Sequence, residues 1–511
     1  MKSKETKIWL MLLSIVVLGA VFRFYDLDNL PMEMFCDIPD GYRYVQRILQ
    51  GERPLDFFIS MGPLFFYLTA FFSLFFKLSF LTMKITSAMI GLAIIIGSYL
   101  LGKELFGFKV GLLTAFLIAV SKWSLAFGRI GNIYILVPCF VVFSSFIFLK
   151  IMKRPKNFRF WIILGILLGI GMYTYASYFV FPMAIYFLFL FKGPKFLFKN
   201  FDKVILMSVI FFLLSSYFLK MFFGNLSTYT DSRSYFGHKI FVAGGKLASD
   251  WPEKLSNNLI KTFLMFNWKG DPGFRVNPLQ DPQLDPISGL FFLVGIGIIL
   301  IRKQWKDRLN IMVLSLFLLI PEILVFNVPT SIPSSTMTIG VFPLAYLLTA
   351  VGINQIYGKT RPFLRRFSLP FLLIVLVAIG LINSKKYFID YAYHLPNHNE
   401  GFPRLIAQEV DKLPEETNIY MYGGGWGEWS QPDWRAVYYE MRKSKQYIHI
   451  AKGKFSCFLF KDDNLPKYFI LDPLSQDDLN QIKECFPEGK EKIHYSPKYH
   501  FPVYISYSPK E

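Results

Sequence analysis

The sequence predicts an α-helical polytopic membrane protein that carries a small α/β domain at its C-terminal end. Of the 511 residues, 53% are hydrophobic and only 18% are charged, whereas soluble domains average about 25% charged residues. Long apolar segments follow one another through residue 383, and the chain from 384 onward becomes polar. These observations predict a membrane domain at 1–383 and a second domain at 384–511.

The basic residues support a membrane protein rather than a nucleic-acid-binding one. The formal net charge is +19, which could suggest a nucleic acid partner. The Lys and Arg residues, however, gather in short loops between apolar segments, as the positive-inside rule predicts. We therefore expect membrane lipids as partners and no nucleic acid.

Windows of about 19 residues identify the candidate spans. Twelve apolar segments lie near residues 8–24, 63–81, 84–102, 108–126, 132–150, 160–175, 177–192, 203–222, 287–301, 309–327, 337–354 and 366–383. If all twelve crossed the membrane, most of the strongly basic loops would lie on the outer side, against the positive-inside rule. If 63–81 instead returns to the outer side, every strongly basic loop becomes cytoplasmic, and about eleven spans remain.

This topology assigns a side to each connection. The cytoplasmic ones are the N-terminus and the basic loops at 103–109, 150–159, 192–203, 302–308 and 359–366. The outward ones are 25–62, 127–132, 223–286, 328–336 and the C-terminal domain. The prediction is an integral protein of a bacterial or archaeal cell membrane.

The C-terminal domain has its own patterns. Residues 418–422 and 467–471 are strand-like, and 403–413 is helical. Cys457 and Cys485 could form a disulfide if this domain lies outside. The four cysteines show no CxxC pair and no zinc spacing.

Two carboxylates stand out in the first outer loop. Asp37 and Asp40 are three residues apart, and Pro39 suits the first turn of a helix. On a helix both acids would share one face, where they could act as catalytic groups or hold a divalent cation. A solvated loop between spans would also carry such residues. Arg43 adds a cation to the same stretch.

Other candidate side chains lie on the same outer side. Arg129 runs against the positive-inside trend, so its partner could be a lipid phosphate, a substrate phosphate or a carboxylate, or it could snorkel to headgroups. Asn132 follows in that loop, and Tyr173 and Tyr175 either belong to the interfacial belt or line a polar cavity. Asp271 occupies a long Pro-rich outer loop, where aspartates are usually turn residues.

The sequence lacks the motifs of several enzyme classes. It contains no Gly-rich phosphate loop, no Ser/His/Asp set and no HExxH. Cytosolic nucleotide chemistry is therefore not expected. No cofactor is required by the sequence, and a divalent cation remains an open alternative.

The order of motifs across residues 8–355 resembles the GT-C membrane glycosyltransferases of the protein-mannosyltransferase and lipid A aminoarabinose-transferase type (glycosyltransferase family 39-like). The resemblance starts from Asp37 in the first outer loop. It continues through Pro63-Leu64-Phe65-Phe66-Tyr67, Leu105-Phe106-Gly107, Arg129 with Gly131, Tyr173-Thr174-Tyr175, Gly270-Asp271 and Leu284-Asp285-Pro286. No single motif is specific, but the series in this order is.

The resemblance implies a reaction and roles for these residues. The donor would be a polyprenyl-phosphate-linked sugar, transferred with inversion on the outer face to a glycan, lipid or protein acceptor. Asp37 would be the general base, with Arg129, Arg43, Tyr173 and Tyr175 binding the donor or its phosphate. Asn132 and Asp271 would serve the acceptor or the structure of the outer loops.

The sequence departs from the family pattern beside Asp37. Ile38 stands where the family usually has an acid, so Asp40 would have to supply the second carboxylate. Gly62 also stands where an acid often precedes the Pro-Leu pair. The alternative function is a lipid-linked glycan transporter or flippase, which needs a similar outward cavity. Such transporters usually contain internal repeats, and we find none in this sequence.

Overall fold

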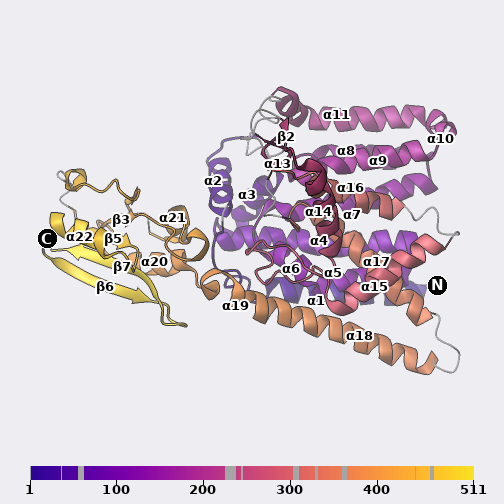
Figure 1. Ribbon diagram of the computed structural model, residues 1–511. Helices are drawn as coiled ribbons and strands as arrows, with labels where there is room; N and C mark the ends of the chain where they lie inside the picture. The colour runs from indigo at the N-terminus through magenta and orange to yellow at the C-terminus, as the bar shows by residue number, and fades with distance from the viewer. Residues whose placement is uncertain are drawn as a thin grey trace.

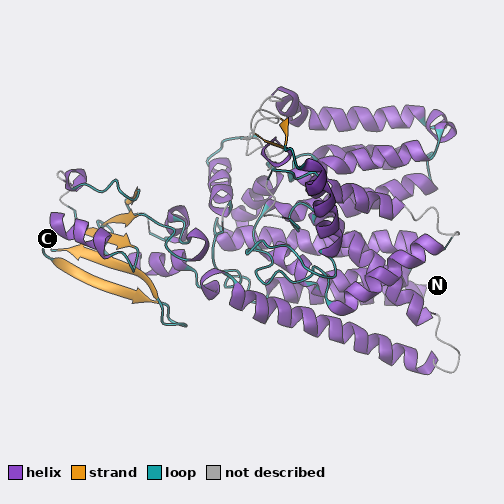
Figure 2. Cartoon of the chain, in the orientation of Figure 1, coloured by secondary structure: helices purple, strands orange, loops and turns teal. Residues whose placement is uncertain are grey.

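The protein is a bundle of apolar helices followed by a small β-sheet layer (Figures 1 and 2). The computed structural model describes residues 2–35, 37–55, 62–224, 237–242, 246–302, 310–327, 332–358, 365–443, 445–460 and 465–510. In Figure 1 the N-terminus and the C-terminal sheet lie at opposite ends of the bundle. The predicted fold class, a helical membrane protein with a C-terminal α/β part, is confirmed.

Every apolar window of the sequence falls on a helix. These helices are α1 Lys2–Phe24, α3 Leu64–Phe76, α4 Phe80–Phe106, α5 Phe108–Val120, α7 Leu136–Lys153, α8 Phe158–Gly171, α9 Val180–Phe191, α11 Phe201–Gly224, α15 Pro286–Ile301, α16 Asn310–Ile323, α17 Phe342–Gly358 and α18 Arg365–Lys385. The short α10 (Pro194–Lys199) carries part of a predicted cytoplasmic loop, and Figure 1 places it at the same end of the bundle as the N-terminus.

Helix length does not confirm the number of spans. Among the described residues, six helices are long and apolar enough to cross a membrane, or seven if one bent pair counts as a span. Five further apolar helices, α3 among them, have only 10–17 residues. The count of eleven and the return of 63–81 therefore remain predictions. The basic stretches 303–308 and 359–364 lie outside the described residues.

The bent pair is stabilised by a buried arginine. α5 and α6 (Lys122–Arg129) meet at 58°, and Ser121 caps α6 by accepting a hydrogen bond from the Ser124 N–H. Arg23 of α1 is fully buried and donates to the carbonyls of Ile118 and Ala119 and to the Ser124 hydroxyl. Arg23 thus supplies donors to carbonyls that lose their helical N–H partners at the break, so the bend is a fixed feature.

Two helices, α2 (Ile38–Leu49) and α3, follow the first apolar helix and its loop. α2 follows the first outer loop and α3 follows Gly62. The Gly62 N–H donates to the Thr174 carbonyl at 2.7 Å, and a Cβ at Gly62 would lie 2.1 Å from the Tyr173 carbonyl oxygen. No side chain fits there, so in this arrangement position 62 cannot carry the acid expected from the family pattern.

The C-terminal part is a five-stranded mixed sheet. Its strands are β3 Asn418–Tyr422, β4 Tyr447–Ile450, β5 Lys467–Leu471, β6 Gly489–Tyr495 and β7 Pro502–Pro509, in the order β4-β3-β5-β7-β6. β3 pairs in parallel with β4 and β5, and β7 pairs antiparallel with β5 and β6. The strands predicted at 418–422 and 467–471 are both present.

Three helices pack with this sheet, namely α20 (Phe402–Val410), α21 (Trp434–Glu440) and α22 (Gln476–Cys485). Cys485 at the end of α22 is disulfide-bonded to Cys457, with Cα atoms 5.3 Å apart. α18 continues through a π-helical turn, Lys386–Tyr391, into α19 (Ala392–His394). The predicted domain boundary at 383/384 therefore falls within one continuous helical run.

Candidate functional site

Asp37 lies immediately before the first residue of α2, as its N-cap. The neighbouring apolar side chains hold this position, because Phe35 is fully buried and Ile38 is 1% exposed. Pro39 occupies the first turn, where the missing N–H costs nothing. Between these anchors the Asp37 side chain stays 41% exposed, so its carboxylate is accessible.

Two groups from distant parts of the chain meet the Asp37 carboxylate. The Tyr134 hydroxyl donates to Oδ2 at 3.2 Å, and Arg275 Nη1 lies 3.6 Å from the same oxygen. The Arg275 guanidinium also lies over the Tyr134 ring, 5.5 Å from its centroid. We call Asp37, Tyr134 and Arg275 the outer triad, after the predicted side of the loops that carry Asp37 and Arg275. An accessible carboxylate beside a cation can accept a proton from one substrate and leave the cation to an anionic group of another.

The loop that carries Arg275 is held by hydrogen bonds. The Arg275 carbonyl accepts from the Tyr391 hydroxyl at 2.7 Å. Asp271, 4% exposed, accepts from the Gly273 N–H at 2.6 Å and from both the N–H and the hydroxyl of Ser335 at 2.6 and 2.5 Å. Burial raises the pKa of Asp271, and these donors oppose that shift. Asp271 therefore positions the loop that carries Arg275.

Asp40 points to a different partner from Asp37. Its Oδ1 lies 2.5 Å from Nη1 of Arg435 in α21, and Arg435 also pairs with Asp433 at 2.7 Å. Partial burial raises the pKa of Asp40, and the Arg435 charge opposes the rise. Tyr42 of α2 stacks on Tyr439 of α21 with centroids 4.3 Å apart. Asp40 thus contributes to the docking of α2 on α21.

Arg129 does not reach Asp37, and its expected contact with a donor phosphate does not fit this geometry. Its side chain is fully buried. The Nη1 and Nη2 groups donate to the carbonyls of Phe22, Arg23, Asp26 and Leu30 at 2.7–3.3 Å. Arg129 satisfies two of the last carbonyls of α1, where a helix leaves its acceptors unpaired, and two carbonyls of the loop that follows. Its role here is to fix the first outer loop.

The remaining predicted residues occupy several environments. Tyr175, 5% exposed, packs edge-on against Tyr134 at 4.8 Å, so it supports the outer triad. Asn132 accepts from the Ile133 N–H at 2.6 Å and caps a 3₁₀ turn. The Tyr173 carbonyl accepts from the N–H of Leu64 at 3.2 Å, and the Tyr173 side chain is half-buried. Arg43 is exposed on α2.

Arg275 is the site residue that the sequence interpretation missed. It is a cation in a predicted outer loop, and it follows the Gly270-Asp271 pair by four positions. The charge rule that selected Arg129 does not single it out, because that rule applies to short loops and the predicted loop 223–286 is long and contains several lysines. No spacing rule connects position 275 to position 37 either.

The two candidate carboxylates do not form a cation site in this arrangement, because Asp37 faces Arg275 and Asp40 faces Arg435. Within the described ranges, no group of three or more His, Cys, Asp or Glu side chains could hold a metal ion.

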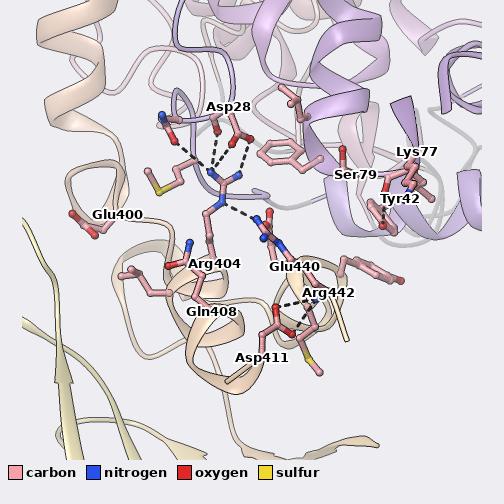
Figure 3. Close-up of a pocket in the computed structure, with 18 of the residues that line it drawn as sticks. Asp28, Tyr42, Lys77, Ser79, Glu400, Arg404, Gln408, Asp411, Glu440 and Arg442 are labelled. Atoms are coloured by element: carbon pink, nitrogen blue, oxygen red, sulfur yellow. Dashed lines mark hydrogen bonds and ion pairs between the residues drawn. The ribbon is translucent and has the colours of Figure 1, made fainter. Parts of the chain in front are cut away.

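A polar cavity of about 960 Å³ lies on the Tyr42 side of α2, between the membrane domain and the C-terminal part (Figure 3). Arg404 bridges it: Nη2 lies 3.0 Å from Asp28 Oδ1 and Nε lies 3.4 Å from Glu440 Oε2. Figure 3 shows Lys77, Ser79 and Tyr42 on one wall and Glu400, Gln408, Asp411 and Arg442 on others. Neither Asp37 nor Arg275 lines this cavity.

Comparisons with known proteins agree with this architecture. The profile of the family described as Dolichyl-phosphate-mannose-protein mannosyltransferase matches residues 60–219. The structure is similar to the crystal structure of ArnT from Cupriavidus metallidurans bound to undecaprenyl phosphate, with a TM-score of 0.63, 10% identity, and 98% of each chain covered. It is also similar to ArnT from the same organism in the apo state, with a TM-score of 0.61, 10% identity, and 99% and 98% of the chains covered.

No curated protein sequence matches the chain. The structural similarity extends over nearly the whole length of both chains, and the family profile covers the segment from the start of α3 to α11. The chain therefore has the GT-C fold of the membrane glycosyltransferases, as the order of its sequence motifs predicts.

Proposed function

We propose that this protein is a glycosyltransferase that moves a sugar, with inversion, from a polyprenyl-phosphate-linked donor to an acceptor hydroxyl at the outer face of the membrane. The observation that carries the proposal is the Asp37–Arg275 pair, in which an accessible carboxylate lies 3.6 Å from a guanidinium at the end of a GT-C helical bundle. The acceptor would be a glycan, a lipid or a protein.

Asp37 acts as the general base in this mechanism. Tyr134 and Arg275 both use Oδ2, and the exposed side chain leaves Oδ1 to accept the acceptor proton. The acceptor oxygen attacks the anomeric carbon as the bond from that carbon to the phosphate oxygen breaks, and the bonding electrons go to the phosphate. General base catalysis of this kind contributes typically about 10²- to 10⁴-fold.

Arg275 takes the role that the sequence assigned to Arg129. A sugar linked through phosphate to a polyprenol carries one negative charge, and the departing polyprenyl phosphate gains a second. A guanidinium in place before the reaction stabilises that developing charge, and its planar fork suits phosphate oxygens. Its 3.6 Å contact with Asp37 is longer than a hydrogen bond, so a phosphate can replace it.

Three observations support an outward-facing site. The N-terminus and the C-terminal sheet lie at opposite ends of the bundle (Figure 1). The C-terminal part contains the Cys457–Cys485 disulfide, which is typical of an oxidising compartment. α10, from a strongly basic loop, lies with the N-terminus, as expected for a cytoplasmic N-terminal end.

Cleavage of the sugar–phosphate bond separates this proposal from a flippase. The full-length protein, reconstituted in vesicles, is given polyprenyl-phosphate-linked mannose, glucose or 4-amino-4-deoxyarabinose together with an envelope glycolipid extract. We expect one donor to release sugar-free polyprenyl phosphate in equal amount to the sugar that appears in the extract. Movement of intact donor across the bilayer without cleavage would support the flippase and contradict the proposal.

A further inference from the structure

Trp429 is an exposed tryptophan close to the outer triad, and its backbone has a conformation that residues other than glycine seldom adopt. Residues 423–432 connect β3 to α21, and we call them the tryptophan loop. Trp429 has φ 54° and Ser430 has φ 60°, within the left-handed region that residues other than glycine seldom adopt. Residues in such conformations persist where the surrounding structure determines them, and they concentrate at functional sites.

Hydrogen bonds fix the tryptophan loop at several points. The Gly427 N–H donates to the Gln431 carbonyl at 2.6 Å. Glu428 and Asn397 bond reciprocally: the Asn397 N–H donates to Glu428 Oε2 at 2.8 Å, and the Glu428 N–H donates to Asn397 Oδ1 at 3.1 Å. The left-handed backbone at Trp429 is thus held by its neighbours.

The ring of Trp429 stacks on Phe274, with centroids 4.3 Å apart and an interplanar angle of 16°. Phe274 in turn packs edge-on against the buried Phe35 at 5.6 Å. Phe274 precedes Arg275, and Phe35 lies two residues before Asp37. The aromatic column therefore rests on both segments that supply the charged pair.

Stacking on Phe274 covers only one face of the indole. Trp429 remains 61% exposed, so a large aromatic surface stays available beside the site. The face of an aromatic ring carries negative charge density, which suits the weakly positive C–H groups on the apolar face of a sugar ring. A lipid tail would be the alternative occupant of such a surface, because Trp is also common at membrane interfaces.

We infer that Trp429 is a specificity-determining residue that stacks on the sugar ring of the lipid-linked donor. This inference rests on the proposed function. If Arg275 holds the phosphate, the sugar lies directly beside it, since the two are joined through one oxygen atom. Trp429 approaches that position from the C-terminal part, through Phe274, and so contacts the sugar and not the polyprenyl chain.

Two lipid probes test this assignment. Binding of polyprenyl phosphate without sugar is compared with binding of the same lipid carrying mannose, glucose or 4-amino-4-deoxyarabinose, using the full-length protein in nanodiscs. Trp429→Ala should weaken binding of the preferred sugar-linked lipid about tenfold, as the loss of one ring-stacking contact does, and leave the sugar-free lipid within twofold. Trp429→Phe should weaken binding of the sugar-linked lipid less than Trp429→Ala does.

A matched control is Trp9→Ala. Trp9 is 55% exposed in the first half of α1, and the N-terminus lies at the opposite end of the bundle from the C-terminal sheet (Figure 1), so this change should affect neither probe. Unchanged affinities in Trp429→Ala, or equal losses for both lipids, would overturn the inference. A wild-type protein that binds the sugar-free lipid as tightly as the sugar-linked forms would overturn it too. A wild-type protein that binds no polyprenyl phosphate would instead contradict the proposed function, and the inference with it.

Discussion

Arg275 Nη1 lies 3.6 Å from Asp37 Oδ2, although the two residues belong to different outer loops. Tyr134 connects them, since it donates to Asp37 at 3.2 Å and lies under the Arg275 guanidinium. The contact places a cation beside the proposed base without neutralising it through a tight ion pair. The predictions below follow from this relationship and from the structures that hold it.

Replacement of Arg275 should weaken the donor complex. Arg275→Ala should raise KM for the sugar-linked lipid by about 10- to 100-fold, because charge-assisted hydrogen bonds are worth about 1.5–3 kcal/mol. Arg275→Lys should recover part of the affinity, since lysine keeps the charge but not the planar fork. Steady-state kinetics with varied donor lipid measure both effects. An Arg275→Ala protein with wild-type kcat and KM would contradict the phosphate role.

Replacement of Arg129 should lower the stability of the protein and leave donor binding unchanged. Its guanidinium donates to four backbone carbonyls within the protein, so Arg129→Ala should lower the free energy of unfolding by about 3 kcal/mol. Denaturant titration of the purified protein would show the loss. A loss of this size leaves most of the protein folded in the absence of denaturant, and the folded protein should bind donor lipid normally. Wild-type stability combined with lost donor binding would restore the original sequence prediction.

Asp271 should stabilise the loop that carries Arg275. Asp271→Ala leaves buried donors of Gly273 and Ser335 without their acceptor, at a cost of about 3 kcal/mol. Ser335→Ala removes only one of the three donors to that carboxylate and should cost about 1 kcal/mol. Thermal unfolding of the two variants side by side measures the difference. Equal midpoints would mean that Asp271 does not organise this loop.

Glu33 should make stability depend on pH. Its side chain is 1% exposed, and burial raises its pKa well above 4.5; nearby Glu440 and Asp433 add to the rise, while Arg404 and the Phe402 N–H oppose it. The folded protein then keeps a proton that the unfolded chain loses above about pH 4.5. Stability should therefore fall as pH rises from there toward the raised pKa, by at most about 1.4 kcal/mol per pH unit.

Glu33→Gln removes the titrating carboxyl group, so the stability of the variant should depend less on pH above about pH 4.5. The variant should unfold at a higher temperature than the wild type at pH 8, and the difference should shrink toward pH 4.5. Scanning fluorimetry across this range provides the comparison. Parallel profiles for the two proteins would show that Glu33 does not titrate as its burial predicts.

Local sequence patterns predicted much of the fold, but only part of the site. The apolar windows, the strands at 418–422 and 467–471, and the helical start beside Pro39 all depend on neighbouring residues, so periodicity and turn chemistry identify them. The Cys457–Cys485 pair was one of the possibilities left open, and the structure joins these residues.

The contacts of the site could not be predicted from local sequence patterns, because they join segments that are distant in the sequence. The charge argument selected Arg129, which donates to carbonyls at the end of α1 and in the loop that follows it. The same argument could not find Arg275, because it applies to short loops and Arg275 lies in a long one. Spacing placed Asp40 beside Asp37, but Arg435 from α21 engages Asp40. Which cation meets which carboxylate depends on tertiary packing that no sequence interval encodes.

The central claim is that Asp37 accepts the proton of the acceptor hydroxyl. The most direct measurement compares sugar transfer by Asp37→Asn and by Asp40→Asn with the wild type, using the same donor lipid and acceptor extract. The account predicts that Asp37→Asn lowers kcat by about 10²- to 10⁴-fold while affinity for polyprenyl phosphate stays within a few-fold, and that Asp40→Asn keeps most of its activity. Wild-type transfer by Asp37→Asn would contradict it.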